Sequence, residues 1–481
     1  NVLRNVAKEK KMQRWTVNTK LRIEWTEETD GDGHYLPGEL TVFDTKILER
    51  QGATVFKHRV LQAKIKEESC PVVYDLNRDG HSDILLPSND IVMWNLGDGQ
   101  FDNQKLFTAP GFDAPISVYT AIVADFDRDG YVDLLCSGQY KERASTHPST
   151  PQAGLFLFRG DAKGNFVRPG ERVASPAIAL SLPVCVTAGD IDGDGDLDVW
   201  LAQYKNAYRE GSMPTPFYDA NDGYPSYLLV NRGNGIFDDM TEAAGLAPKR
   251  HRRTFAASFV DLDEDLDLDL LVSSDYAGTD IHINSGTGHF TDETDAMLKE
   301  SANFGMGHTF GDYDQDGALD FYVLGMASTT MRRLNQMGLI REDRPEYLEM
   351  RTRMGYGNRM YLAQGLAQGK RTFRQPEFRD HVARSGWSWG TTSFDFDSDG
   401  DMDVYVANGH VSGKTTKDYC TRFWCHDIYT GDSQSSPVLA VLFKETYDSF
   451  ITNNLSWDGY QKNHLFMNQS GKDFINVAFL M

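Results

Sequence analysis

One nine-residue pattern, Asp-x-Asp-x-Asp-Gly-x-x-Asp, recurs six times in this 481-residue chain with only small departures. The copies occupy residues 75–83, 125–133, 190–198, 261–269, 312–320 and 395–403. A short β-prone apolar run follows each copy, such as "VWLA" after Asp198. The copies start 50, 65, 71, 51 and 83 residues apart. Internal repeats of this length are typical of propellers and solenoids.

A second pattern, which follows most copies, is a hairpin with a Gly-rich turn, as in "YLLVNRGNGIF" from Tyr227. Alternating apolar residues that close on a Gly/Asn turn predict antiparallel strands. Each unit then supplies four strands, one on either side of the acidic loop and two in the hairpin. We therefore predict an all-β fold, a seven-bladed β-propeller of four-stranded antiparallel blades that spans residues 1–481. Six blades follow from the repeats, and we expect the N-terminal strands "KLRIEWTEE" and "GELTVFDTKIL" to complete the closing blade.

The acidic loops have the ligand chemistry of a hard cation. Calcium takes six to eight oxygen ligands in flexible geometry, from carboxylates and from backbone carbonyls alike. Positions 1, 3, 5 and 9 would supply side-chain oxygens, and position 7 its backbone carbonyl. An EF-hand begins in the same way, but it needs a Glu at position 12, where the third copy has Leu201. Magnesium demands a tighter octahedron, and transition metals prefer His or Cys ligands.

We therefore predict calcium, in about five to six ions, as the cofactor. The predicted ligand residues are Asp75, Asn77, Asp79, His81 and Asp83 in the first loop; Asp125, Asp127, Asp129, Tyr131 and Asp133 in the second; Asp190, Asp192, Asp194, Asp196 and Asp198 in the third; Asp261, Asp263, Asp265, Asp267 and Asp269 in the fourth; Asp312, Asp314, Asp316, Ala318 and Asp320 in the fifth; and Asp395, Asp397, Asp399, Asp401 and Asp403 in the sixth. The alternative is a set of solvated acidic turns without metal.

Two loops depart from the pattern. The first has neutral Asn77 at position 3, which keeps an oxygen but loses a charge. The fourth has Leu266 in place of the position-6 glycine. A bulky residue is strained at the positive φ that this position requires, so we expect the fourth loop to be the weakest metal site.

The net charge and the hydropathy of the chain argue against some classes of binding partner. The formal charge of −22 disfavours nucleic acid and anionic membranes, and no run approaches the length of a membrane span. Calcium loops of extracellular modules bind weakly, with dissociation constants of about 10⁻⁴ to 10⁻³ M. Such sites fill only where calcium is abundant, so we expect a secreted, periplasmic or cell-surface protein.

The acidic loops and the strands after them resemble FG-GAP/VCBS repeats, as in integrin α-subunit propellers. The stretch "GWSWGTTSFDFDSDGDMDVYVANGHV" at 386–411 is similar to the group associated with the ASPIC/UnbV domain, which includes cartilage acidic protein. The resemblance covers residues 72–481. It implies a calcium-binding seven-bladed propeller that is secreted or periplasmic and acts by binding. The ASPIC/UnbV domain itself is not recognisable in the sequence.

Three inserted segments, 204–227, 328–355 and 412–462, exceed what a blade needs. The first is rich in aromatic residues, which stack on sugars or bury at protein interfaces; the alternative is an ordered loop that packs on its own blade. The second has helical spacing in Met331, Leu334 and Met337 and is a docking helix or a lid over a blade edge. The third holds Cys420 and Cys425, either a local disulfide or two free thiols, and a glycosylation sequon at Asn454; a further sequon begins at Asn468.

Motifs of common enzyme classes are absent from the sequence. The basic cluster His251, Arg252 and Arg253 faces either an anionic ligand or, by the more ordinary interpretation, solvent. The stretch "TDGDGHY" from Thr29 lacks a position-9 carboxylate and is interpreted as a hairpin turn.

We therefore predict an extracytoplasmic binding or structural module whose inserted loops take a protein or glycan ligand, alone or within a larger assembly. The competing prediction is a polysaccharide lyase-like enzyme on the same scaffold. A central cleft that pairs a Tyr or His with an Arg or Lys would favour the enzyme.

Overall fold

The structure is a computed structural model, and it describes residues 13–52, 60, 61, 65, 71–108, 116–140, 153–168, 170–174, 178–207, 214, 218–233, 235–367, 370–410, 436–441, 444, 445 and 461–481. Most of the inserted segment 412–462 lies outside the described residues, together with Cys420, Cys425 and Asn454. Of the described cysteines, Cys136 is a buried free thiol.

Six four-stranded antiparallel sheets, the blades, follow one another along the chain. The first three blades are β3 (Val72–Tyr74), β4 (Asp83–Leu86), β5 (Ile91–Asn95) and β6 (Phe101–Gln104); β7 (Ile116–Ala124), β8 (Asp133–Tyr140), β9 (Gly154–Phe158) and β10 (Glu171–Arg172); and β11 (Pro183–Gly189), β12 (Asp198–Gln203), β13 (Tyr227–Asn231) and β14 (Phe237–Asp239). The other three are β15 (Arg253–Val260), β16 (Asp269–Asp275), β17 (Gly278–Asn284) and β18 (Phe290–Asp292); β19 (His308–Gly311), β20 (Asp320–Val323), β21 (Arg359–Ala367) and β22 (Lys370–Arg374); and β23 (Ser388–Phe394), β24 (Asp403–Asn408), β25 (His464–Asn468) and β26 (Phe474–Asn476).

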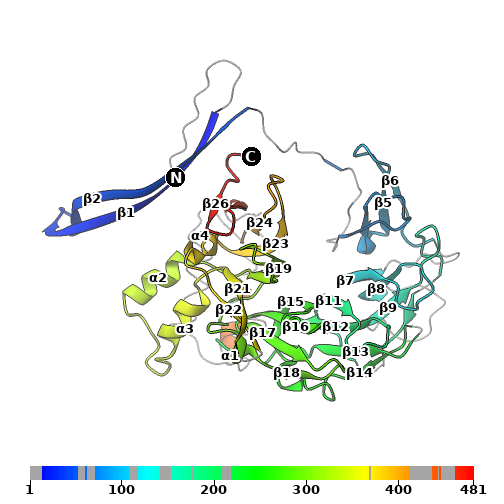
Figure 1. Cartoon of the computed structure of the whole chain (residues 1–481). Helices are drawn as coiled ribbons and strands as arrows, with labels where there is room; N and C mark the ends of the chain where they lie inside the picture. Colours follow the sequence, from blue (N-terminus) through cyan, green and yellow to red (C-terminus); the bar gives the residue numbers. More distant parts are fainter. Residues whose placement is uncertain are drawn as a thin grey trace.

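The blades lie side by side along an open arc, with their first strands on the inside (Figure 1). Neighbouring first strands touch from β3 to β7, β11 and β15, and again from β19 to β23. Between β15 and β19, the Oγ of Ser258 lies 2.8 Å from Nε2 of His308. The predicted β-propeller of four-stranded antiparallel blades is thus confirmed.

Apolar side chains fill the spaces between successive blades, which explains why each strand carries them at alternate positions. Between the second and third blades, for example, Phe126 and Leu135 pack with Val199 and Leu229. Between the fifth and sixth, Tyr322 packs with Val404 and Phe466 on the neighbouring sheet. The hydrophobic core is therefore a series of layers between sheets.

The predicted number of blades is wrong for the part of the chain that the structure describes, where six four-stranded sheets are present instead of seven. The N-terminal strands, β1 (Gln13–Thr29) and β2 (Tyr35–Gln51), pair only with each other, in a two-stranded sheet. Strand propensity was evident in both segments, but propensity does not specify the pairing partner. The N-terminal hairpin is longer than any blade strand and is mostly exposed.

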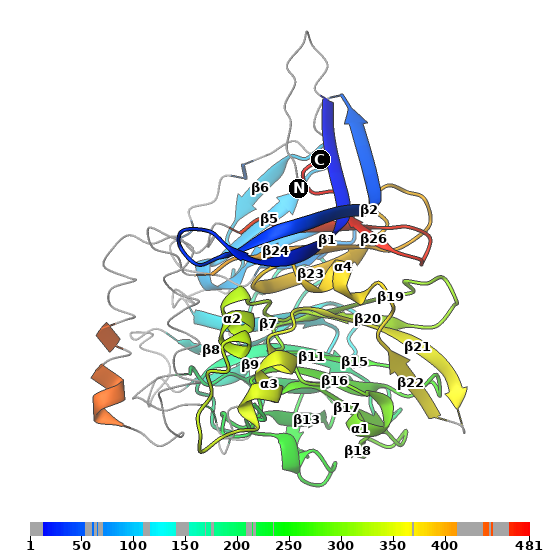
Figure 2. The ribbon, with the colours of Figure 1, turned by 90° about the vertical axis from the view of Figure 1, so that its left-hand side faces the viewer.

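The base of this hairpin lies against the sixth blade (Figures 1 and 2). Leu48 packs on the apolar cluster that contains Leu465 and Ile475. Arg14 donates to the backbone carbonyls of Leu480 and Met481, and Arg50 also donates to that of Leu480. The hairpin therefore covers the face of the sixth blade that has no further four-stranded neighbour among the described residues.

Short helices cover blade ends: α1 (Thr294–Met297), α2 (Thr329–Gln336), α3 (Tyr347–Met354) and α4 (Arg379–Ala383). Helices α2 and α3 lie in the second inserted segment, whose spacing predicted α2 but not α3. Met331 and Met354 are buried against Tyr218 and Phe304, so the pair of helices acts as a lid over the blades. None of the described helices is long and apolar enough to cross a bilayer.

Candidate metal centres

All six acidic loops connect the first strand of a blade to its second, so they lie at the same end of the propeller. At position 6 the backbone is left-handed in every loop, with φ between 76° and 93°. The fourth loop is no exception, because Leu266 adopts a φ of 76° with its side chain 90% exposed. Position 4 is left-handed too, for example at Arg128 with a φ of 58°, a feature that the sequence pattern did not indicate.

Two backbone hydrogen bonds shape each loop in the same way. The amide of position 6 donates to the position-1 carboxylate, at 2.9 to 3.1 Å in all six loops. The amide of position 7 donates to the position-5 carboxylate, at 2.8 to 3.1 Å. The fourth loop therefore keeps the geometry of the others despite Leu266.

Position 9 is integrated into the blade. The carboxylates of Asp83, Asp133, Asp198, Asp269, Asp320 and Asp403 are fully buried. One oxygen of each accepts the amide of position 2, and the other accepts an amide from the third strand or the residues that follow it. In the third loop these donors are Ile191 at 3.2 Å and Asn231 at 2.8 Å. Position 9 thus ties the loop to the sheet, whatever else its oxygens bind, and we call this buried carboxylate the anchor.

The side chains that could hold a cation converge in front of this anchor. Ligand atoms within 4.8 Å of one another come from Asp125, Asp127 and Asp133; Asp190, Asp192 and Asp194; Asp261, Asp263 and Asp265; and Asp312, Asp314 and Asp316. In three of these loops a buried carboxylate oxygen has no hydrogen-bond partner, namely Oδ1 of Asp125, of Asp263 and of Asp314. Buried anionic oxygens without donors are costly unless a cation binds them, so the residues fit a hard cation.

The buried position-9 carboxyls of several loops carry raised pKa values for the same reason. Burial raises the pKa of Asp198, Asp269 and Asp320 to about 7 in each case, with neighbouring aspartates adding to the effect and backbone donors opposing it. Burial also raises the pKa of Asp192 and of Asp263 at position 3. A bound cation would reverse this penalty by favouring the ionised carboxylates.

Position 7 was predicted to act through its carbonyl, which leaves its side chain free for other contacts. The Asp196 carboxylate accepts a hydrogen bond from Nε of Arg128 at 2.5 Å. Asp401 is 3% exposed and accepts the amide of Ser470 at 2.9 Å, while its Oδ1 has no partner. That orphaned oxygen makes Asp401 a candidate side-chain ligand in the sixth loop.

In the third, fourth and sixth blades, an asparagine at the end of the third strand bonds to the acidic loop of the preceding blade, a role that the sequence pattern did not indicate. The Nδ2 of Asn231 donates to the Phe126 carbonyl, that of Asn284 to Ile191, and that of Asn468 to Tyr313, at 2.8 to 3.0 Å. The available signal was the Asn that opens the turn in "VNRGNG", "INSGTG" and "MNQSGK". Asn468 is fully buried, so its sequon is inaccessible in the folded protein.

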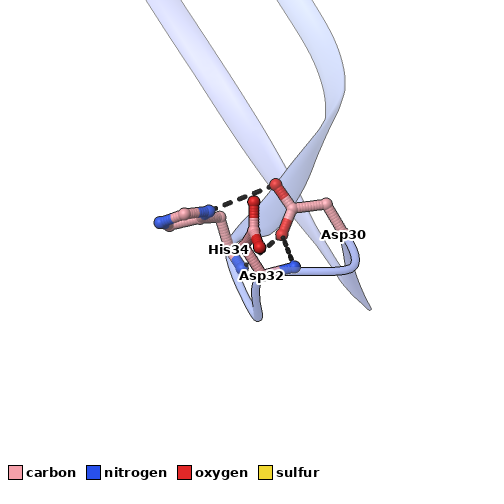
Figure 3. Close-up of side chains that lie close together, drawn as sticks. All are labelled: Asp30, Asp32 and His34. Carbon is pink, nitrogen blue, oxygen red and sulfur yellow. Dashed lines mark hydrogen bonds and ion pairs between the residues drawn. The ribbon is translucent and has the colours of Figure 1, made fainter.

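The hairpin tip, which the sequence marked as a turn without a metal, is such a turn between β1 and β2 (Figure 3). Oδ1 of Asp30 accepts the amides of Asp32 and His34, each at 2.9 Å, and its Oδ2 lies 3.2 Å from Nδ1 of His34. Ligand atoms of the three residues lie within 4.8 Å of one another, but all three side chains are exposed. The turn is held by its own hydrogen bonds.

Two of the three residues of the basic cluster, Arg252 and Arg253, are buried, so its interpretation as a solvated turn is wrong for them, whereas His251 is exposed. Arg253 has no exposed surface and makes two 2.9 Å hydrogen bonds to the Asp222 carboxylate. Arg252, 8% exposed, bonds to Asp219 and Asp280. Their partners come from distant parts of the chain, and these ion pairs satisfy the buried charges.

Each of the three inserted segments joins the second strand of a blade to the third, so each begins and ends at the end of the propeller opposite the acidic loops. There the first strands of the second, fourth and sixth blades are bulged at Tyr119, Phe255 and Trp389. The Tyr204 ring stacks on Phe255 with centroids 4.1 Å apart, and Phe255 meets Trp389 edge-on at 6.0 Å. Trp389 is 43% exposed, which leaves an accessible aromatic surface.

Two segments, residues 75–136 and 261–323, match the sequence profile of the FG-GAP-like repeat. These parts of the chain are FG-GAP-like repeats. They contain the first, second, fourth and fifth acidic loops, so the match includes the loop with Leu266. No curated protein sequence is significantly similar to the chain.

The chain is also similar to solved structures with low identity. An Agrocybe aegerita lectin that recognises non-reducing terminal N-acetylglucosamine is 17% identical, with a TM-score of 0.40, over 71% of this chain and 75% of the lectin. The exotype rhamnogalacturonan lyase YesX is 11% identical, with a TM-score of 0.31, over 85% and 62%. The Vibrio cholerae biofilm matrix protein Bap1 is 16% identical, with a TM-score of 0.27, over 55% and 36%. At these values the comparisons say nothing about ligands.

Proposed function

We propose that the chain is a calcium-stabilised β-propeller that works outside the cytosol as a binding module. The acidic loops hold calcium at one end, and a glycan or protein ligand docks at the other. The observation that carries the metal half is the set of buried, unpartnered carboxylate oxygens within the clusters of the second, fourth and fifth loops. The similarity of residues 386–411 to the ASPIC/UnbV-associated group is consistent with this role.

Positions 1, 3 and 5 would hold each ion, with the position-7 carbonyl and position 9 completing the set. A bound ion would supply the positive charge that these carboxylates lack. Since it binds only the folded loop, it stabilises the propeller by mass action, by about 2 kcal/mol per site at twenty times the dissociation constant.

The binding half rests on the bulged aromatic residues at the opposite end. Bulges redirect side chains and occur often beside functional sites. The Tyr204, Phe255 and Trp389 group offers ring faces of the kind on which sugars and protein side chains pack. Three inserted segments start and end near the same end of the blades, where they can add specificity.

The competing lyase proposal receives no support from the described residues at this end. Tyr204 donates to the Asp275 carboxylate at 2.9 Å, so a candidate base is present. Arg253, which interacts electrostatically with Tyr204, is enclosed, and its donors bond to Asp222 and the Lys205 carbonyl. It is therefore not placed to neutralise a substrate carboxylate.

Melting curves in calcium and in chelator test the metal half. We expect chelator to lower Tm by several degrees or more, and magnesium at the same concentration to restore little of it. An unchanged Tm would overturn the metal proposal. For the binding half, the calcium-loaded protein is applied to glycan and protein arrays beside Trp389→Ala. Ligand binding that Trp389→Ala leaves intact would remove the aromatic group from the proposal.

A further inference from the structure

The side chain at position 4 of an acidic loop reaches across to the loop of the next blade. Arg78 of the first loop donates to the Gly130 carbonyl of the second and lies over the Tyr131 ring, 5.9 Å from its centroid. Arg128 of the second loop bonds to Asp196 of the third. Gln315 of the fifth loop donates to the Gly400 carbonyl of the sixth at 3.2 Å. The receiving residues lie at positions 5 to 7 of the next loop.

The contact made by Arg128 is the most extensive. Its Nε donates to Oδ1 of Asp196 at 2.5 Å, and its Nη2 donates to the Asp194 carbonyl at 3.3 Å. Its Nη1 lies 3.2 Å from where a Cβ on Gly195 would be. Arg128 thus fits over positions 5 to 7 of the third loop, where a larger residue at position 6 would displace it.

Position 4 lies between two predicted ligands, positions 3 and 5, and its backbone is left-handed in every loop. An ion that organises Asp127 and Asp129 would therefore fix the direction in which Arg128 leaves the loop. Arg128 in turn holds Asp196, whose carbonyl is a predicted ligand of the third loop. The effect of one ion can pass to the next site through this single side chain.

We infer that the position-4 side chains couple calcium binding between neighbouring loops, and that Arg128 is a positioning residue for the third site. This inference rests on the proposed calcium binding. The coupling joins the first, second and third loops, and separately the fifth and sixth.

The contacts between neighbouring acidic loops are interrupted at the third and fourth loops. Position 4 of the third loop is Gly193, which has no side chain to reach the fourth loop. Position 4 of the fourth loop is Glu264, which pairs with Arg371 of β22 in the fifth blade and not with an acidic loop. The six sites therefore divide into coupled groups around a fourth loop that binds on its own.

Calcium binding measured by equilibrium dialysis tests the coupling in four proteins: the intact chain, Arg128→Met, a second-loop knockout (Asp125→Asn with Asp129→Asn), and the combination. In the intact chain, we expect the knockout to remove one ion and to weaken the ions of the first and third loops roughly five-fold each, the low end of measured coupling between sites. In the Arg128→Met background, the knockout should remove its own ion and weaken that of the first loop, which Arg78 contacts, but leave that of the third loop unchanged.

Arg232→Met is the matched control. Arg232 is as exposed as Arg128, 49% against 52%, and its charge also acts on the third loop, at Asp192. It pairs with Asp238 of its own blade and reaches no other acidic loop among the described residues. Arg232→Met should retain the coupling. Gln315→Ala should abolish coupling between the fifth and sixth loops alone.

Two failures are distinguishable. If the intact chain binds no calcium, the proposed metal function fails and the coupling fails with it. If it binds calcium but Arg128→Met and Arg232→Met respond identically to the second-loop knockout, only the coupling is overturned. Melting of each variant in chelator, expected to resemble that of the intact chain, excludes a folding defect as the cause.

Discussion

The blade loops and the hairpin-tip loop are both turns rich in aspartate and glycine, yet they are built differently. In both, an aspartate at the start accepts amides from residues further along the turn, as Asp30 does from His34. Only the blade loops add a position-9 carboxylate that is buried and bonded both to the loop itself and to the third strand or the residues that follow it. The comparison shows that a buried anchor, more than the number of acidic residues, distinguishes an ordered cation site from an exposed acidic turn.

The largest expected difference comes from removing the anchor. Asp269→Ala leaves the amides of Leu262 and Asn284 buried without their acceptor, at a cost of about 3 kcal/mol. Asp30→Ala leaves its donors to water, because the tip is exposed, and should not change the unfolding midpoint. Urea denaturation in chelator measures both without a contribution from calcium. Equal losses in the two variants would contradict the comparison.

The anchor also predicts a pH dependence that the tip cannot produce. The folded pKa of Asp198, Asp269 and Asp320 is raised to about 7, from about 3.8 in the unfolded chain. Between these values the folded calcium-free protein holds more protons than the unfolded chain, so these groups destabilise it increasingly as pH rises from about 4 to about 7. Calcium relieves this effect, because it favours the ionised carboxylates.

The calcium-induced increase in Tm should therefore be several degrees larger at pH 7.5 than at pH 5. The difference between curves with calcium and with chelator is the relevant measurement, because buried histidines also titrate in this range. Burial lowers the pKa of His308 and of His464 to about 4. Both histidines destabilise the fold on acidification with or without calcium, so their effect cancels. A calcium increment that is constant with pH would count against ion binding at the buried carboxylates.

The sequence was sufficient to predict whatever depends on short-range pattern. The acidic repeat located the connection between first and second strands, and the Gly/Asn turns located the outer hairpins. Helical spacing around Met331 predicted a helix that the structure contains. In each case the residues that form the element are adjacent in the chain, so local geometry determines them.

What depended on distant partners was out of reach. Arg253 looked like part of a solvated turn because its partner Asp222 lies 31 residues away. The Asn468 sequon looked available because the sequence does not show that Nδ2 reaches Tyr313 in the preceding blade. The number of blades was overestimated because β1 and β2 have the propensity of strands but pair only with each other.

A smaller effect is expected at Leu266, the one position-6 residue that is not glycine. It has a φ of 76° and is 90% exposed, so its side chain adds strain without burying apolar surface. Leu266→Gly should stabilise the chain by about 1 kcal/mol, measured by urea denaturation in chelator. The comparison variant is Gly317→Leu in the fifth loop, which places a leucine at a φ of 88° and should destabilise by a similar amount. If Leu266→Gly destabilised the chain instead, this leucine would make a contact whose stabilisation exceeds the cost of the strained backbone.

The smallest effect is expected at the hairpin tip. Asp32→Asn removes one of the three groups that converge there, and the matched change in a blade loop is Asp192→Asn, also at the middle of three convergent groups. Because the tip has no buried carboxylate behind it, water can satisfy all its oxygens without an ion. Asp32→Asn should therefore leave both the calcium-induced Tm increase and the number of bound ions unchanged, whereas Asp192→Asn should weaken one ion. If Asp32→Asn removed an ion, an exposed turn held by its own hydrogen bonds would be sufficient to bind calcium, and the buried anchor would not be what separates the two kinds of loop.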